Sequence, residues 1–141
     1  MKAISNEEVI RRSFAEWNRR NPGYFLEVTT ADYALHSPSN NPNPISKWDA
    51  VKTLEAFWAG FPDIQFRIED LITAGDRVIV RFVGSGTHRG EFMGIPATGK
   101  KIEVSALTIA RIENGKVAEE WEELDVFGLL KQIGGEVVPK K

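Results

Sequence analysis

The chain has 141 residues, the size of one typical domain, and 42% of them are hydrophobic, which is enough for an ordinary core. It has no cysteine, which excludes disulfides, thiolate metal sites and a cysteine nucleophile, and its net charge of −2 gives no electrostatic footprint for nucleic acid. No apolar run approaches the roughly 18 residues of a membrane-spanning helix, and no apolar signal core opens the sequence. We therefore expect one soluble, cytoplasmic domain over residues 1–141 that binds neither nucleic acid nor membrane.

The first half of the chain predicts two helices. Ser5 and Glu8 have the spacing of a capping box at the start of residues 5–21, where apolar residues recur at helical spacing. Ser46 has the same role at the start of residues 47–61, and a proline ends that segment.

Short segments and strands make up the rest of the chain. Residues 24–28 favour a helical turn, residues 31–38 alternate like a short strand, and residues 39–44 are typical of a loop. After Pro62 the apolar period changes to two, and Asn114-Gly115 is typical of a type I′ hairpin turn. These patterns predict strands over residues 64–74, 77–88, 101–113 and 116–125, and a final short helix over residues 126–135.

Helices followed by a run of antiparallel strands predict an α+β fold, with the helices packed on one face of a curved sheet. Gly84 and Gly86 lie inside a predicted strand, where glycines often mark a bulge or a sharp bend. Because straight helices cannot fill a strongly bent sheet, we expect a cavity between the two layers.

The hairpin turn allows the register of the last two strands to be predicted. If Glu113 pairs with Lys116 and pairing continues regularly, Trp121 lies opposite Thr108 and Asp125 lies opposite Val104. This face carries mostly small residues on the strand over residues 101–113, so we expect it to be the open, concave one. A β-bulge would reverse the assignment.

The opposite face of the same hairpin mixes apolar and charged side chains. Such a surface suits a two-fold interface, and we expect a homodimer that uses it. The residues predicted on this face are Leu107, Ile109, Arg111, Glu120 and Glu122.

Asp125 is the acid of greatest interest on the predicted concave face. If His36 or His88, each near a strand end, meets it there, the pair is suited to proton transfer near neutral pH. A plainer alternative is that Asp125 caps the helix that follows, that both histidines are structural or exposed, and that the tryptophans belong to the core.

Two segments, "THRGEFMGIPATGKKIEV" and "ARIENGKVAEEWEELDVFGLLKQIG", closely resemble the SnoaL-like polyketide cyclase (ester cyclase-like) family of the NTF2-like superfamily. The histidine-to-proline run in the first segment is the most specific part. The segment "SPSNNPNPISKW" departs from the glycine-rich run that is usual there, so the substrate is the least defined part of the resemblance.

The resemblance implies an α+β cone, in which a curved antiparallel sheet is wrapped by N-terminal helices around a deep pocket, and a homodimer. In characterised members a pocket aspartate is the general acid/base for an intramolecular aldol ring closure, without metal, cofactor or covalent intermediate. Asp125 corresponds to that aspartate, His88 to a pocket partner, and His36 to the histidine that ends the first strand. The residues that we expect to line the pocket are Trp17, Trp58, Phe92, Met93, Val104, Ala106 and Trp121.

The expected function is therefore that of a cofactor-independent acid/base enzyme acting on a hydrophobic carbonyl compound. An epoxide hydrolase on the same scaffold would need a second aspartate and an arginine facing Asp125. An isomerase would need a tyrosine and a second acid, and neither Tyr24 nor Tyr33 is clearly placed by the sequence. A non-catalytic protein that binds a small apolar ligand is the remaining alternative.

Overall fold

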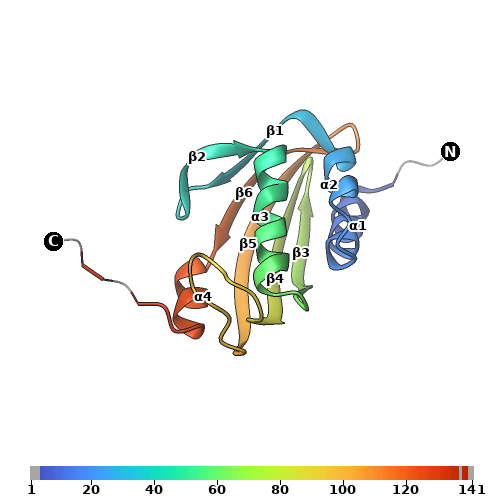
Figure 1. Ribbon diagram of the computed structural model, residues 1–141. Helices are drawn as coiled ribbons and strands as arrows, with labels where there is room; N and C mark the ends of the chain where they lie inside the picture. Colours follow the sequence, from blue (N-terminus) through green and yellow to red (C-terminus); the bar gives the residue numbers. More distant parts are fainter. Residues whose placement is uncertain (1–3, 137, 140–141) are drawn as a thin grey trace.

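The structure is a computed structural model that describes residues 4–136 and 138–139. None of the helices in this part of the chain is long and apolar enough to cross a membrane. In chain order the elements are α1 (Asn6–Asn18), α2 (Pro22–Val28), β1 (Thr29–Ser37), β2 (Asn41–Ser46), α3 (Lys47–Gly60), β3 (Gln65–Ala74), β4 (Arg77–Thr87), β5 (Lys101–Glu113), β6 (Lys116–Leu124) and α4 (Val126–Gln132) (Figure 1).

The six strands form one curved sheet in the order β2-β1-β6-β5-β4-β3. Neighbouring strands are antiparallel except for β1 and β6, which are parallel. Helix α3 crosses the concave side of the sheet, with α1 and α2 beside it and α4 at the far end of β6 (Figure 1). The predicted α+β cone is confirmed, and the parallel pair is the feature that the sequence did not predict.

The two long helices begin where their capping residues predict. The side chain of Ser5 accepts a hydrogen bond from the backbone N–H of Glu8 at 3.2 Å, and that of Ser46 accepts one from Asp49 at 3.3 Å. Each bond satisfies one backbone donor that the first helical turn leaves free.

The segment predicted as a loop is instead the edge strand β2. It pairs with β1 through Ala34 and Ser46 and through Leu35 and Ile45. The prediction was wrong because two prolines hide the strand pattern, yet proline is tolerated on an edge strand, where one side of the backbone needs no partner. The helical turn expected just before β1 is the short helix α2.

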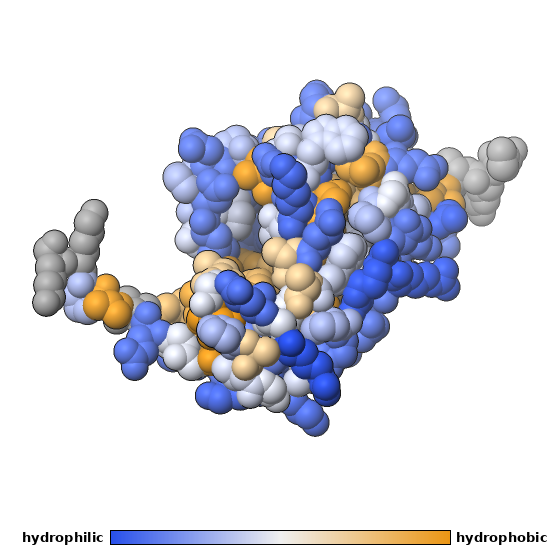
Figure 2. All heavy atoms as spheres, viewed as in Figure 1, coloured by the Kyte–Doolittle hydropathy of each residue, from blue (hydrophilic) through white to orange (hydrophobic). Residues whose placement is uncertain are grey.

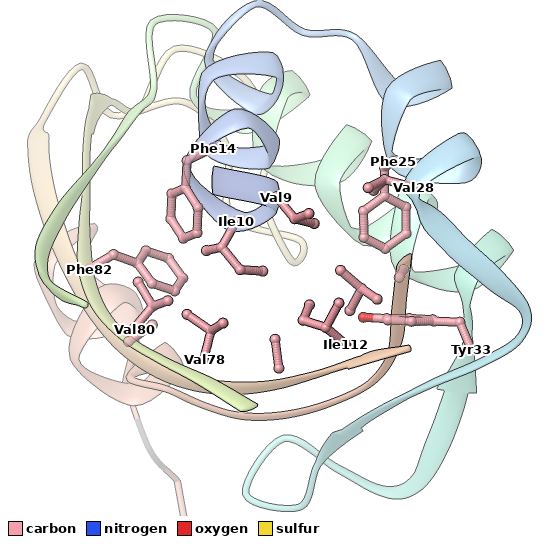
Figure 3. Close-up of a cluster of buried hydrophobic side chains, with 14 of the residues drawn as sticks. Val9, Ile10, Phe14, Phe25, Val28, Tyr33, Val78, Val80, Phe82 and Ile112 are labelled. Carbon is pink, nitrogen blue, oxygen red and sulfur yellow. The ribbon is translucent and has the colours of Figure 1, made fainter. Parts of the chain in front are cut away.

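The main core lies between the helices and the concave face of the sheet. Val9, Ile10 and Phe14 form the apolar side of α1 and point toward β4, where alternate residues such as Val80 and Phe82 are buried (Figure 3). A second cluster of buried side chains lies between the end of α3, the β4–β5 connection and α4. The two clusters anchor opposite ends of the helical layer.

The glycines of β4 do not mark a bulge. Gly84 pairs regularly with Val104 and Gly86 with Ile102, and the irregularity in this region lies in β3 instead. A Cβ atom on Gly84 would approach the ring of Phe66 to 3.1 Å, so glycine is needed there for close packing and not for a bend.

The β5–β6 hairpin begins as predicted and then shifts. Asn114 and Gly115 both have positive φ, 50° and 77°, as a type I′ turn requires, and Glu113 pairs with Lys116. A bulge at Ala118 then changes the register of the pairing. As a result the consecutive residues Val117 and Ala118 are both buried, at 3% and 4% exposure.

The bulge reverses the faces of the rest of β6. Trp121 lies opposite Ile109 on the convex face, so its predicted position on the helix-covered side is wrong. Glu120 and Glu122 lie opposite Ala110 and Thr108 and reach the concave side, which corrects their predicted place on the outer face.

Candidate functional site

A cavity lies between the helices and the concave face of the sheet. Its volume is about 80 Å³. Its walls are mainly aromatic and include Trp17, Phe25, Phe57, Phe66 and Phe82. Large rigid rings from five different elements thus enclose a largely apolar space of the kind that binds small organic molecules.

Four polar residues interrupt the apolar walls. Tyr33 comes from β1, Thr53 from α3, and Glu120 and Glu122 come from β6. The tyrosine hydroxyl points inward from β1 toward the centre of the core (Figure 3). The acids reach the cavity because the bulge at Ala118 turns alternate residues of β6 to the concave side.

Glu120 is 7% exposed and accepts a 2.7 Å hydrogen bond from the hydroxyl of Tyr33. Burial removes water from the carboxylate and raises the pKa of Glu120 to about 7, and the nearby charge of Glu122 adds to the rise, whereas the bond from Tyr33 opposes it. Burial and the adjacent carboxylate also raise the pKa of Tyr33 well above its ordinary value, so the phenol stays a hydrogen-bond donor.

Glu122 lies on the same face of β6 as Glu120 but forms no hydrogen bond with Tyr33. No side chain or backbone group in the described part of the chain donates a hydrogen bond to its carboxyl group, which faces the cavity. Burial raises the pKa of Glu122 to about 7, with a smaller contribution from the charge of Glu123. Glu122 therefore exchanges its proton close to neutral pH and has a free face for a ligand.

The charged side chains among the described lining residues of the cavity are all acidic. None of the described lining residues is a lysine, an arginine or a histidine. Groups of three or more histidine or acidic side chains that could hold a metal ion are not found among the described residues either. The site therefore suits an uncharged ligand better than an anion, which would meet two carboxyl groups without a compensating cation.

Asp125 occupies a different place from the one predicted by the regular register. It is the exposed N-cap of α4, and its Oδ1 accepts a hydrogen bond from the backbone N–H of Gly128 at 2.9 Å. It borders an open groove on the outside of the sheet together with Ser39, Arg81 and Phe127. The alternative that Asp125 caps the final helix is confirmed.

The two histidines lie apart from Asp125 and from each other. His88 is fully buried and its Nδ1 lies 2.9 Å from Thr98 Oγ1, so it anchors the β4–β5 connection. His36 stacks on Trp121 with ring centroids 5.4 Å apart and lies 2.7 Å from Glu119, on the convex face. The three residues assigned to catalysis by the sequence are therefore not brought together.

The predicted pocket residues are divided in the same way. Trp17 and Val104 line the cavity. Ala106 is buried on the concave face and borders the outer groove at the strand end. Of the others, Phe92 packs against Phe57 in the second core cluster.

Besides Phe92 and Ala106, three more of the predicted pocket residues do not line the cavity. Trp58 packs at the edge of the second cluster, and Met93 is 64% exposed. Trp121 lies on the convex face, where Arg77 covers its ring at 4.9 Å. Tyr33, Glu120 and Glu122 take their place as polar residues of the cavity.

Sequence reasoning missed the two glutamates for one reason. Strict alternation from the hairpin turn puts them on the outer face, and only the pair of consecutive apolar residues, Val117 and Ala118, signals a bulge. Leu124 gives a second signal, because an apolar residue in phase with Glu120 and Glu122 indicates a buried face.

Comparison with known proteins places this geometry in context. The family model described as SnoaL-like polyketide cyclase matches residues 7–133. A search of curated proteins finds no significant match. The solved structures, in contrast, include several similar to nearly the whole chain.

Three of these structures illustrate the range of similarity. AclR from Streptomyces galilaeus, named as a candidate hydroxylase, is 30% identical with a TM-score of 0.83, over 90% of this chain and 93% of that one. IdmH from Streptomyces antibioticus, named as a candidate polyketide cyclase, is 28% identical with a TM-score of 0.81, over 90% and 96%. A SnoaL-like protein from Jannaschia sp. CCS1 is 21% identical with a TM-score of 0.81, over 97% and 100%, which shows the shared fold alone.

Proposed function

Because this chain belongs to the SnoaL-like polyketide cyclase family, we propose that its concave cavity is the active site of a cofactor-independent acid/base enzyme. The substrate is a hydrophobic, polyketide-like carbonyl compound, and the reaction is an intramolecular aldol-type ring closure. The aromatic walls and the absence of cations among the described lining residues support an uncharged substrate.

The observation that carries the proposal is the placement of Glu122. It faces the cavity, it has no hydrogen-bond partner in the described part of the chain, and burial raises its pKa to about 7. A carboxyl group with these properties can take a proton and return it near neutral pH, which is what a general acid/base must do. Glu122 thus takes the role that the sequence assigned to Asp125.

The proposed reaction needs only one proton to move. The carboxylate of Glu122 removes a proton from a carbon that lies between two carbonyl groups of the substrate. The resulting enolate carbon attacks a second carbonyl carbon of the same molecule, forming the new bond, and the alkoxide takes the proton back from Glu122. Proximity in the cavity and one positioned base each supply several kcal/mol to such a step.

Glu120 and Tyr33 have a supporting role in this proposal. Their 2.7 Å hydrogen bond fixes the position of Glu120 beside Glu122 on the same strand face. When one of the two acids is ionised, the charge disfavours ionisation of the other, so the pair holds one proton over a range of pH.

Replacing Glu122 with glutamine tests the proposal. The amide keeps the size of the side chain but cannot accept the proton, so turnover of a cyclisable polyketide-like substrate should fall by roughly 10²–10⁴-fold. Glu103→Gln, an exposed acid on β5 that does not line the cavity, is the matched control and should keep full turnover. An active Glu122→Gln enzyme at the wild-type rate would remove Glu122 from the mechanism.

A second candidate reaction is favoured by the Tyr33–Glu120 pair. A tyrosine bonded to an acid, next to another acid, is the equipment that a proton-transferring isomerase needs, and Tyr33 is now placed in the cavity. Product analysis separates the two reactions, because ring closure removes a carbonyl group whereas isomerisation only moves a double bond. If neither product forms but the compound binds, the protein is a non-catalytic binder.

The residues that the sequence assigned to catalysis remain a testable alternative. Asp125 borders the open outer groove, so an acid/base role for it would place the substrate outside the aromatic cavity. His88 could act only through the β4–β5 connection that it anchors, and His36 only through Glu119 on the convex face. The Asp125 variants described in the Discussion distinguish this alternative from the Glu122 proposal.

We also propose that the protein is a cytoplasmic homodimer that uses the convex face of the sheet. The paired residues Ile72, Ile79, Ile109 and Trp121 run in register across β3, β4, β5 and β6. Ile72 is 58% exposed and the others are partly exposed, so this row of apolar side chains is partly open to solvent. A second copy of the chain would bury it.

A further inference from the structure

A second, much smaller cavity lies behind Glu120, between α1 and the sheet. Its volume is about 10 Å³, close to the smallest space that can hold one water molecule. Trp17 and Glu120 line both cavities, whereas Thr108 of β5 lines only the smaller one. The small cavity therefore lies on the inner side of the proposed acid pair.

Two residues that line this cavity each carry a buried polar atom without a partner among the described residues. The indole Nε1 of Trp17 and the hydroxyl of Thr108 form no hydrogen bond to any described residue. The indole can only donate, and the hydroxyl can donate and accept. Buried polar atoms are almost always satisfied in folded proteins, so two residues with such atoms on one small cavity favour a polar occupant.

The other hydroxyl groups around the small cavity are already occupied as donors. Ser13 donates to the backbone oxygen of Val9 at 2.8 Å, and Thr29 donates to that of Phe25 at 2.8 Å. The strongest acceptor left on this cavity is the carboxyl group of Glu120, which has more lone pairs than the single bond from Tyr33 uses. Trp17 and Thr108 thus supply unused donors, and Glu120 supplies an unused acceptor.

We propose that one water molecule occupies this cavity, accepts hydrogen bonds from Trp17 Nε1 and Thr108 Oγ1, and donates one to Glu120, so that Thr108 is a positioning residue for Glu120. Three partners lie within the usual range of two to four for a buried water. The connected groups then run from Tyr33 through Glu120 and the water to Thr108 and Trp17. Every group in this hydrogen-bonded series has a partner, which fixes the orientation of the Glu120 carboxyl group.

The water distinguishes the two acids of the main cavity. Hydrogen bonds to a carboxylate favour its charged form, and Glu120 receives two of them whereas Glu122 receives none from the described residues. Glu120 therefore ionises first, and Glu122, which ionises at the higher pH, is the stronger base of the pair once it is ionised. This consequence for catalysis rests on the proposed function, but the water site itself does not.

Thr108→Val tests the inference because it keeps the shape of the side chain and removes the hydroxyl. Carbon-13 NMR of labelled glutamate, with the Glu120 signal assigned by its loss in Glu120→Gln, gives the pKa of Glu120 without any activity measurement. The expected result is a rise of about one pH unit in Thr108→Val, from the lost support of the charged form. Thr108→Ser should restore the wild-type value, since it keeps the hydroxyl.

Two further measurements make the test decisive. Thr53→Val removes a hydroxyl that lines the main cavity but not the small one, and should leave the pKa of Glu120 unchanged. A rotating-frame cross-peak between water and the indole N–H of Trp17 should be present in the wild type. Absence of that cross-peak, or the same Glu120 pKa in Thr108→Val and wild type, would overturn the inference. If it holds while Glu122→Gln keeps full turnover, only the proposed function fails.

Discussion

Glu120 and Glu122 show how two identical residues two positions apart acquire different roles. Burial raises the pKa of both to about 7, so at neutral pH each is poised between its acid and its base form. Their neighbours differ, because Tyr33 donates to Glu120 at 2.7 Å, whereas Glu122 faces open space in the cavity. A fixed acid next to a free one is suited to proton transfer to a bound molecule.

The buried state of Glu120 predicts a pH dependence of stability. Its pKa is 4.5 in an ordinary environment and about 7 in the fold. Since the folded value is the higher one, the protonated carboxyl contributes stability that is complete below about pH 4.5 and is lost as the pH rises through 7. Each pH unit of pKa difference corresponds to about 1.4 kcal/mol, so the loss reaches up to ~3 kcal/mol.

Glu120→Gln should remove this loss, because the amide does not ionise and its oxygen can still accept from Tyr33. We expect the variant to match the wild type at about pH 4 and to be more stable by up to ~3 kcal/mol at about pH 8. Urea unfolding at both values measures the difference. Parallel stability curves for the two proteins across this range would show that Glu120 is not buried as the structure has it.

At the scale of the elements, the β5–β6 hairpin shows which features can be predicted from the sequence and which cannot. The turn at Asn114 and Gly115 is predictable because both residues suit the positive φ that a type I′ turn requires, a purely local demand. The bulge at Ala118 depends instead on packing, since it lets two consecutive apolar residues be buried in the core. Because one shifted residue exchanges the two faces of a strand, a correct turn still put Glu120, Glu122 and Trp121 on the wrong faces.

Strand β2 illustrates the same limit at the edge of the sheet. Its sequence, "NPNPIS", has neither alternation nor β-branched residues before Ile45, so its local pattern favours a loop. It becomes a strand because the exposed edge of β1 supplies hydrogen-bond partners. Capping residues, by contrast, act within a few positions along the chain, and both long helices could be placed from them.

The start of α4 gives a prediction for Asp125. Its carboxylate accepts from Gly128, so Asp125→Ala should cost about 1 kcal/mol of unfolding free energy through the lost cap, whereas Asp125→Asn should keep most of the stability. Under the Glu122 proposal both variants should keep turnover near the wild-type rate. Denaturant unfolding and turnover with the same substrate are the two measurements.

The Asp125 variants also test the competing assignment of the acid/base role to Asp125. A drop in turnover of roughly 10²-fold or more in Asp125→Asn, with unfolding unchanged, would return the acid/base role to Asp125. It would also move the reaction from the aromatic cavity to the outer groove that Asp125 borders. Loss of stability without loss of turnover in Asp125→Ala would confirm a purely structural cap.

For the molecule as a whole, the two faces of the sheet have opposite characters. The concave face is covered by α1, α2 and α3 and holds the main core together with the acid pair (Figure 1). On the side seen in Figure 2, apolar side chains gather between charged ones near α3 and α4. None of the helices in residues 4–136 crosses the convex face, yet Ile79, Ile109 and Trp121 continue in register along it.

Ile109 lies in the middle of that row, between Ile79 on β4 and Trp121 on β6. If two copies pack through this face, Ile109→Glu places a carboxylate in the interface and opposes association, both by burying a charge and by repulsion between the copies. Light scattering at micromolar concentration should give twice the 15.8 kDa chain mass for the wild type and a single chain mass for Ile109→Glu. Lys52→Glu, at an exposed position on α3 away from the sheet face, is the control and should remain a dimer. A monomer mass for the wild-type protein would refute the proposed homodimer and would leave the apolar row for another partner.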